Sequence, residues 1–294
     1  MQQYLKIALM FIVIFLCISS ASVLVILSGA SASACAFWRV FISSILLWAY
    51  SIFFKKSSRL VSYPDDRLLI LSIVSGIFLG MHFLLWMKSL FLVQVAISTT
   101  IVTTYPLFNL LIDAVVFKER VSVIQIIFMI IGFIGVVLFI HPRILGSQSI
   151  LGVILAFIAS IVVALYFSIG RYVRRKIGLL DYLKIVYLSA SVTILLYALI
   201  TRENIINYGL RSYLFFLALA LIPMLGGHTL MNYLLRYLRT SIVTSISLTE
   251  PIGASILAYY ILGQELSIEK ILIMMMVIIS VAIAMYQGIK EIES

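Results

Sequence analysis

Apolar runs long enough to cross a membrane follow one another along almost the whole chain, with short polar stretches between them. A helix needs roughly 20 apolar residues to span the hydrocarbon core of a bilayer. The pattern therefore predicts an all-α integral membrane protein with ten transmembrane helices. Their expected limits are 5–28, 34–54, 68–90, 95–117, 121–140, 148–170, 182–201, 211–235, 240–262 and 267–287. The first run is long for a signal peptide and nine more follow, so we expect a retained helix.

The composition supports this prediction and excludes other classes of protein. Of the 294 residues, 64% are hydrophobic and 11% are charged, against about 25% charged residues in a typical soluble domain. A soluble enzyme, a nucleic-acid-binding domain and a disordered chain are therefore excluded as first interpretations. Cys17 and Cys35 lack metal-ligand spacing, so we expect two packed thiols and no metal site.

The basic residues give the predicted helices an orientation. The chain has 21 Lys and Arg against 11 Asp and Glu, a net charge of +10. Most of the basic residues fall in alternate loops, which the positive-inside rule places in the cytoplasm together with both termini. Two termini on one side require an even number of spans. We expect the basic cluster of Arg171, Arg174, Arg175 and Lys176 to face anionic lipid headgroups.

The second half of the chain resembles the first. Residues Ile97–Pro106 are similar to Ile242–Pro251, which lie 145 positions later. Residues Leu79–His82 are similar to Leu225–His228 with an offset of 146, one residue out of step. The chain therefore reads as two copies of one five-span unit.

A repeated unit of five spans predicts an inverted architecture. Five is an odd number, so two such units in tandem cross the membrane in opposite directions. We predict the repeats over residues 1–143 and 144–294, with a midplane cavity between them built from spans one to four and six to nine. Spans five and ten carry almost no charge inside the membrane, and we expect them to support the scaffold or a homodimer.

Several short segments carry a family resemblance. They are Phe37–Arg39, His82–Leu90, Tyr105–Phe108, Phe117–Arg120, Gly227–Tyr237, Glu250–Pro251 and Leu262–Glu265. In this order, and with their repetition, they resemble the EamA family of the drug/metabolite transporter superfamily, over nearly the whole chain. The resemblance implies a ten-helix carrier of small metabolites that works by alternating access. One departure is that the fourth span has Tyr105 where the ninth has Glu250.

Glu250 is the most central ionisable residue of the predicted spans. A charge at the centre of a membrane helix costs about 2.5–3.5 kcal/mol, so it should face a partner or a wet cavity. Pro251 follows directly and loosens the helix by removing a backbone N–H. Glu250 could recognise a substrate amine or carry a coupling proton; it could equally bond to a neighbouring helix. Pro106 and Pro251 occupy matching positions and are candidate hinges.

Other polar and aromatic residues are candidates for substrate binding or coupling. Arg39 could hold a substrate carboxylate, or its long side chain could snorkel to the interface. His82 and His228 occupy matching repeat positions and could relay protons, or bond across a tight helix pair. The remaining candidates, each with helix packing as the alternative, are Trp38, Trp86, Thr103, Tyr105, Asn109, Tyr166, Asn232 and Thr249.

Three further features favour structural roles. We expect Asp113 to form a local salt bridge with Lys118 or Arg120, which follow it closely in the sequence. Lys88 is near a helix end and can reach the interface. Gly76 and Gly80 form a GxxxG pattern, which is typical of close helix packing.

The sequence contains no catalytic, phosphate-loop or metal-binding motif. We therefore expect no enzyme activity and no cofactor. The pattern favours a secondary transporter in the cell membrane that moves a small metabolite, an amino acid or related compound, in the export direction. The expected partners are this substrate and the lipid bilayer, with proton coupling and a homodimer also considered, and no nucleic acid. A structural or signalling membrane protein and an intramembrane lipid-modifying enzyme are the alternatives.

Overall fold

The computed structural model describes residues 2–54, 63–140, 147–263 and 267–293, and these residues form helices and connections without a β-strand. Eight helical segments within them are long and apolar enough to cross a membrane. In chain order the elements are α1 (Gln2–Ser19), α2 (Ala21–Leu27), α3 (Ala32–Phe54), α4 (Asp66–Leu90), α5 (Val95–Val102), α6 (Tyr105–Val115), α7 (Val123–Ile140), α8 (Ser147–Arg174), α9 (Leu179–Thr201), α10 (Leu210–Leu219), the π-helix η1 (Ala220–His228), α11 (Thr229–Leu234), α12 (Thr240–Ser245), the 3₁₀ turn η2 (Ile246–Thr249), α13 (Glu250–Leu262) and α14 (Ile268–Glu293).

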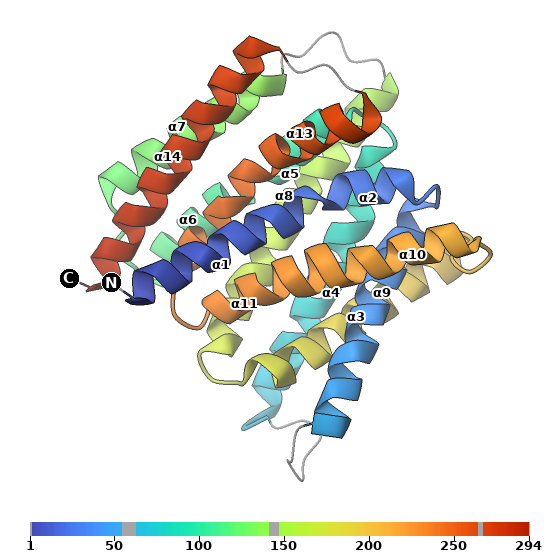
Figure 1. The fold of residues 1–294 in the computed structure, drawn as a ribbon. Coiled ribbons are helices and arrows are strands. Elements are labelled where there is room, and N and C mark those ends of the chain that lie inside the picture. Colours follow the sequence, from blue (N-terminus) through green and yellow to red (C-terminus); the bar gives the residue numbers. More distant parts are fainter. Residues whose placement is uncertain (1, 55–62, 141–146, 264–266, 294) are drawn as a thin grey trace.

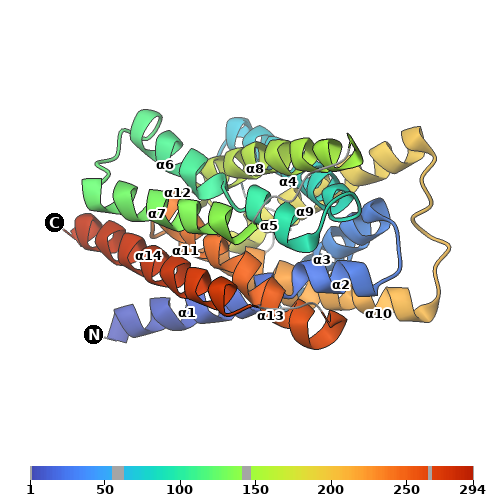
Figure 2. The same cartoon turned by 90° about the horizontal axis from the view of Figure 1, so that it is seen from above.

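The helices pack as one bundle with a distinct edge (Figure 1). The centre of the bundle is formed by α4, which packs along α8 and α9. The edge is formed by α7 and α14, which lie against each other along their length in both views (Figures 1 and 2). These two helices correspond to the predicted spans five and ten, so the expected scaffold pair lies beside the main bundle.

The two ends of the bundle carry different connections (Figure 2). Both termini and the α6–α7 connection lie at one end, which we call the terminal end. The α9–α10 connection lies at the other end, which we call the far end. The predicted repeat boundary at residues 143 and 144 falls outside the described residues.

The predicted fourth span is not one continuous helix. It consists of α5 and α6, which meet at Thr103 and Thr104. Pro106 explains the interruption, because it lacks an N–H and its ring would clash with the carbonyl of Val102, four residues earlier. The last residue of α5 is Val102. Neither helix reaches membrane-spanning length alone, which is why this span is absent from the eight continuous segments of the described chain.

Two spans of the second repeat are also interrupted. The ninth span runs through α12, the 3₁₀ turn η2 and α13, and Pro251 is the second residue of α13. The eighth span contains the π-helix η1 around Pro223. Short stretches of 3₁₀- and π-helix within a longer helix are often found at functional sites.

The central helices approach each other closely through glycine. A Cβ added at Gly76 would lie 2.5 Å from the carbonyl oxygen of Val186, and one added at Gly80 would lie 2.9 Å from that of Ala190. Only hydrogen fits at these two positions between α4 and α9. The packing role expected for the GxxxG pattern is therefore confirmed.

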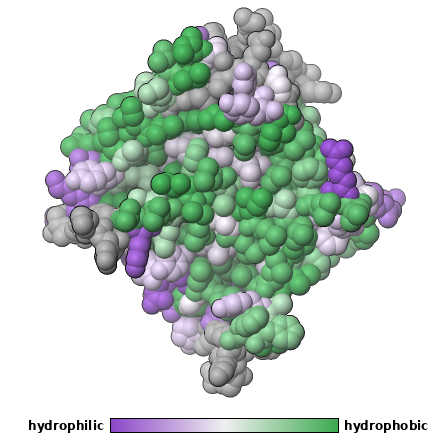
Figure 3. Space-filling view, in the orientation of Figure 1, coloured by the Kyte–Doolittle hydropathy of each residue, from purple (hydrophilic) through white to green (hydrophobic). Residues whose placement is uncertain are grey.

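The outside of the bundle is apolar, as a lipid-facing surface requires. Figure 3 shows hydrophobic side chains over most of the face that carries α1, α13 and α14. The largest exposed side chains include Ile200 at 82% and Tyr260 at 79% exposure. Lipid tails solvate such groups without the cost that water would impose.

Candidate substrate cavity

A small cavity lies in the middle of the bundle, where the helix interruptions meet. Its volume is about 20 Å³, enough for about one water molecule. This volume is too small for a metabolite. The cavity is lined by Ile18, Ala21, Arg39, His82, Phe83, Trp86, Val102, Tyr105, His228 and Glu250. Six of these are among the twelve residues that the sequence indicates for substrate binding or coupling.

Arg39 is the buried cation of this cavity. It projects from α3 and is 1% exposed. Its guanidinium carbon lies 4.2 Å from the ring centroid of Phe83, a cation–π contact. Among the described residues, Nε and Nη1 find no hydrogen-bond partner. A guanidinium has five N–H donors in a planar fork, which matches a carboxylate, so these unused donors are suited to an anionic group of a ligand.

Glu250 is the buried carboxyl group of the cavity, and it comes from the other repeat. It begins α13 directly after η2, and it is 9% exposed. The positive end of the α13 dipole favours a carboxylate at this first position. Glu250 and Arg39 both line the cavity. The cavity thus brings together a buried guanidinium from α3, in the first half of the chain, and a buried carboxyl group from α13, in the second.

The two histidines lie side by side, with ring centroids 6.5 Å apart. The Nδ1 atom of His82 lies 3.1 Å from the carbonyl oxygen of Ala159. Because a carbonyl can only accept, Nδ1 of His82 carries a proton and Nε2 is its free acceptor in the neutral ring. The His82 ring stacks on Trp86 with centroids 6.1 Å apart, and the His228 ring stacks on Phe167 at 5.7 Å. The histidines therefore belong to an aromatic wall of the cavity.

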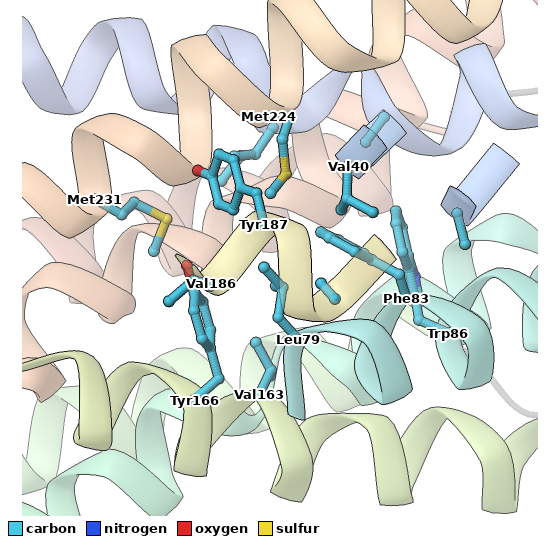
Figure 4. Close-up of a cluster of buried hydrophobic side chains, with 14 of the residues drawn as sticks. Val40, Leu79, Phe83, Trp86, Val163, Tyr166, Val186, Tyr187, Met224 and Met231 are labelled. Carbon is cyan, nitrogen blue, oxygen red and sulfur yellow. The ribbon is translucent and has the colours of Figure 1, made fainter. Parts of the chain in front are cut away.

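Two other predicted residues support this wall from behind. Asn232 donates from Nδ2 to the hydroxyl of Tyr166 at 2.5 Å and to the carbonyl oxygen of His228 at 2.7 Å. Figure 4 shows the ring of Tyr166 rising from α8 beside Val186, with Phe83 and Trp86 projecting from α4. Asn232 and Tyr166 are fully buried and lie outside the cavity lining. Their arrangement fixes the position of His228 at the end of η1.

The other predicted residues lie away from the cavity. Trp38 donates from Nε1 to the carbonyl oxygen of Ile205 at 2.7 Å, near the far end. Asn109 joins α6 to α8 through the carbonyl oxygen of Ala164 at 2.9 Å. Thr103 bonds within its own helix, to the carbonyl of Thr100, and Thr249 to that of Ile246. Pro106 and Pro251 adjoin the two helix interruptions.

Two expectations from the sequence are wrong at the terminal end. Asp113 does not pair with its sequence neighbours; its Oδ1 lies 3.1 Å from Nη1 of Arg171. Its Oδ2 accepts the backbone N–H of Ser241 at 2.7 Å. Arg171 and Arg174 are 1% and 2% exposed, so this part of the basic cluster does not face lipid headgroups. A buried carboxylate from another helix neutralises Arg171, which spacing along the chain cannot show.

This ion cluster joins the two repeats at the terminal end. Glu119, from the first repeat, pairs with Arg171 and with Nε of Arg239, the latter at 3.2 Å. Arg175 approaches the same carboxylate at 3.4 Å. We call Asp113, Glu119, Arg171 and Arg239 the terminal-end ion cluster. Three of its four members are buried, so separating the repeats here requires new partners for buried charges.

A second polar network joins the repeats at the far end. Nζ of Lys88 lies 2.7 Å from Oε1 of Glu203. Ser33 and Tyr197 also bond to Glu203. Partial burial opposes the charge of Glu203, but the hydrogen bonds from Lys88 and Ser33 outweigh it, so the pKa of Glu203 is lowered. Glu203 is not predicted from the sequence, because nothing in the linear sequence connects it to Lys88, 115 residues away.

The π-helix η1 is a second feature that the sequence does not predict. It contains Pro223, Gly226 and Gly227, and it places His228 at the cavity. A proline followed closely by two glycines inside an apolar run could have signalled an irregular helix. The glycines also allow α1 to come close, since a Cβ on Gly227 would lie 2.8 Å from the side chain of Ile18.

Comparisons with known proteins agree with this arrangement. A model of the EamA-like transporter family matches the chain twice, over residues 5–141 and 150–286. A curated protein of Rickettsia bellii (strain RML369-C), named S-adenosylmethionine uptake transporter, is 25% identical over 233 residues, 78% of this chain and 75% of that protein. A protein of the same name from Rickettsia prowazekii (strain Madrid E) is 24% identical over 234 residues, 78% and 74% of the two chains.

The fold is also shared with a solved crystal structure. It superposes with a TM-score of 0.77 at 15% sequence identity, and the match covers 97% of this chain and 98% of that one. The two family matches together span nearly the whole sequence, on a bundle of helices that are long and apolar enough to cross a membrane. The chain is therefore a multi-pass membrane protein of the EamA-like transporter family, and a small-metabolite transporter rather than an enzyme.

Proposed function

We propose that this protein is a secondary transporter for a zwitterionic, amino-acid-type metabolite, which binds between Arg39 and Glu250. The observation that carries the proposal is a buried cation with unused N–H donors that shares the cavity with a buried carboxyl group from the other repeat. An α-amino acid presents a carboxylate and an ammonium group a few bonds apart. Arg39 is suited to the first group and Glu250 to the second.

The proposed architecture has ten spans in two inverted repeats. The pair α5 and α6 forms the fourth span and α7 the fifth, which adds two to the eight continuous segments of the described residues. Two termini at one end of the bundle support an even number (Figure 2). The excess of basic residues in the loops at that end supports a cytoplasmic location for both termini, in the cell membrane.

The proposed mechanism is alternating access. The terminal-end ion cluster and the network around Glu203 tie the two repeats together at opposite ends of the bundle. The cavity between them is too small for a metabolite. We therefore propose that the two networks are gates that open in turn, and that Pro106 and Pro251 allow the helix rearrangement. A ligand that pairs with Arg39 and Glu250 would bind the open and closed conformations with different affinity. This difference in affinity drives the rearrangement.

S-adenosylmethionine is the first cargo to test, because two relatives are named as its uptake transporters. It is an amino acid with a sulfonium cation and an adenine ring. The aromatic lining of Phe83, Trp86 and Tyr105 can hold a cation or stack on a base. These names favour uptake, whereas the sequence pattern favoured export. In either direction, Glu250 is the proposed site of amine recognition or proton coupling.

The test is transport by proteoliposomes under an imposed pH gradient. Labelled S-adenosylmethionine and a mixture of free amino acids are offered on either side, and movement in both directions is quantified by mass spectrometry. Glu250→Gln and Arg39→Lys are compared with Glu269→Gln and Arg202→Lys, which change exposed residues in the same way. We expect saturable transport that both cavity variants reduce at least tenfold and both control variants leave unchanged.

The outcomes separate the parts of the proposal. Loss of pH dependence in Glu250→Gln with substrate binding retained assigns this carboxylate to coupling. Reduced binding assigns it to amine recognition. Transport that is equal in all five proteins overturns the site. Folded, inserted protein that moves none of these compounds overturns the amino-acid class.

A further inference from the structure

A large apolar groove lies between α1 and α14, separate from the central cavity. Its volume is about 810 Å³. Its floor is formed by Ile246 and Thr249 of η2. Its walls are Ile7, Ala8, Phe11, Ile12 and Phe15 of α1 with Ile278, Val281, Ala282, Met285, Tyr286, Ile289 and Lys290 of α14. We call this feature the lateral groove.

The lateral groove opens toward the hydrocarbon of the membrane. Both walls belong to segments that are long and apolar enough to span a bilayer. Figure 3 shows the surrounding face as hydrophobic over most of its area. An apolar groove of this size on a lipid-facing surface is not left empty, since its lining would lose van der Waals contacts and water has no hydrogen-bond partners there. A lipid chain is the occupant that the surroundings supply.

The length of the lateral groove matches one leaflet. Its lining extends along α1 from Ile7 to Phe15 and along α14 from Ile278 to Lys290. At 1.5 Å per residue these stretches measure about 12 and 18 Å. Half of a hydrocarbon core is about 15 Å. The groove therefore accommodates one acyl chain of the leaflet at the terminal end.

Basic residues stand where the headgroup of such a lipid would lie. Lys290 is exposed and lines the terminal end of the groove. Lys6 is also exposed and directly precedes Ile7 on the opposite wall. Ammonium groups at the membrane surface attract anionic headgroups. We propose that the lateral groove is a binding site for a phospholipid, with an acyl chain packed against η2 and an anionic headgroup at Lys290.

The proposal gives the lipid a position behind the central cavity. Thr249 forms part of the groove floor, and the next residue, Glu250, lines the cavity. The acyl chain therefore fills space on the outer side of the interrupted ninth span. At the groove floor, this acyl chain would contact the face of η2 that a neighbouring helix would otherwise cover.

The test is native mass spectrometry of the full chain in detergent, titrated with dioleoylphosphatidylglycerol or dioleoylphosphatidylcholine. Ala282→Trp fills the groove from its wall. The matched control is Ile279→Trp, which adds the same ring at an exposed position of α14 outside the groove. We expect one tight phosphatidylglycerol site, weakened at least tenfold by Ala282→Trp and unchanged by the control.

Lys290→Gln tests the headgroup without altering the groove. We expect about a fivefold weaker affinity for phosphatidylglycerol and no change for phosphatidylcholine, since one basic residue near a membrane surface contributes about that factor. Equal lipid binding by Ala282→Trp and Ile279→Trp overturns the site. Equal affinity for the two lipids in the parent protein overturns the headgroup assignment. A parent dimer that Ala282→Trp converts to a monomer, with lipid binding unchanged, shows that a second copy occupies the groove. Binding is measured without transport, so the proposed function can fail while this site stands.

Discussion

The charges of Arg39 and Glu250 can be removed together or one at a time, and the two experiments should give opposite results. Removing one partner of a buried ion pair leaves an uncompensated charge and costs about 3–5 kcal/mol of stability. Replacing both by neutral side chains of similar size is often neutral, or stabilising by about 1–4 kcal/mol. The perturbations are Arg39→Met, Glu250→Gln and the double variant.

For the double variant, the structure favours a gain in stability over no change. Arg39 is 1% exposed, and its Nε and Nη1 have no hydrogen-bond partner among the described residues. Each buried donor left unsatisfied costs about 1–3 kcal/mol. Methionine removes these donors and keeps an apolar contact with Phe83. We therefore expect each single variant to be destabilised by about 3 kcal/mol, and the double variant to equal or exceed the parent protein.

The assay is reversible unfolding in mixed micelles with a denaturing detergent, followed by circular dichroism. The four proteins form a double-mutant cycle, which isolates the coupling between the two side chains. Transport by the same proteins in liposomes gives the second measurement. The double variant should be stable and inactive, because groups that serve a ligand are retained at the expense of stability.

Two results would refute this reasoning. If the losses of unfolding free energy in the two single variants add up in the double variant, the two side chains do not interact and do not form a joint binding site. If the double variant transports at the parent rate, then Arg39 and Glu250 do not contact the cargo.

Three other perturbations give distinct expectations. Gly76→Ala should cost about 1–3 kcal/mol, because its Cβ would lie 2.5 Å from a backbone oxygen of α9, whereas Gly132→Ala, with its nearest neighbour at 3.7 Å, should unfold like the parent protein. Asp113→Asn should lose about 1.5–3 kcal/mol in the same unfolding assay, since it weakens a charged hydrogen bond to the buried Arg171. Glu203 has a lowered pKa in the folded protein, so its stabilising contribution is present at neutral pH and is lost as the pH falls through the acidic range in which the carboxylate is protonated. Thermal unfolding of Glu203→Gln should therefore show a lower midpoint at pH 7 and a weaker acid dependence than that of the parent protein. An unchanged pH profile would contradict the assignment.

The sequence predicts features that depend on local pattern or on repetition. Long apolar runs identify the helices, and the family assignment suggested by the repeated segments is confirmed. Pro106 and Pro251 adjoin interruptions because the effect of proline acts within one helical turn. Four of the residues that the sequence indicates, Arg39, His82, His228 and Glu250, lie together at the cavity.

Contacts between distant segments could not be predicted in this way. Arg171 reads as a surface cation because it stands in a basic cluster, but its partner Asp113 lies 58 residues away on another helix. Lys88 and Glu203 are even further apart in the sequence. Which carboxylate meets which cation depends on helix rotation and tilt, and a single sequence with two nearly uniform apolar halves contains little information on either.

The π-helix η1 bears on how the two repeats have diverged. The family matches begin 145 residues apart and also end 145 residues apart, yet His82 and His228 are separated by 146. The second copy therefore carries one additional residue before His228 and one fewer after it. A π-helical turn closes its hydrogen bonds over i→i+5 and so holds one residue more than an α-helical turn.

The wide turn of η1 thus absorbs the added residue where it occurs. In a regular α-helix, one insertion would rotate every later side chain by about 100°, and His228 would leave the cavity. With this wide turn, His228 lines the same cavity as His82, its counterpart in the first repeat. The irregular turn thus accommodates a difference of one residue between the two halves of the chain.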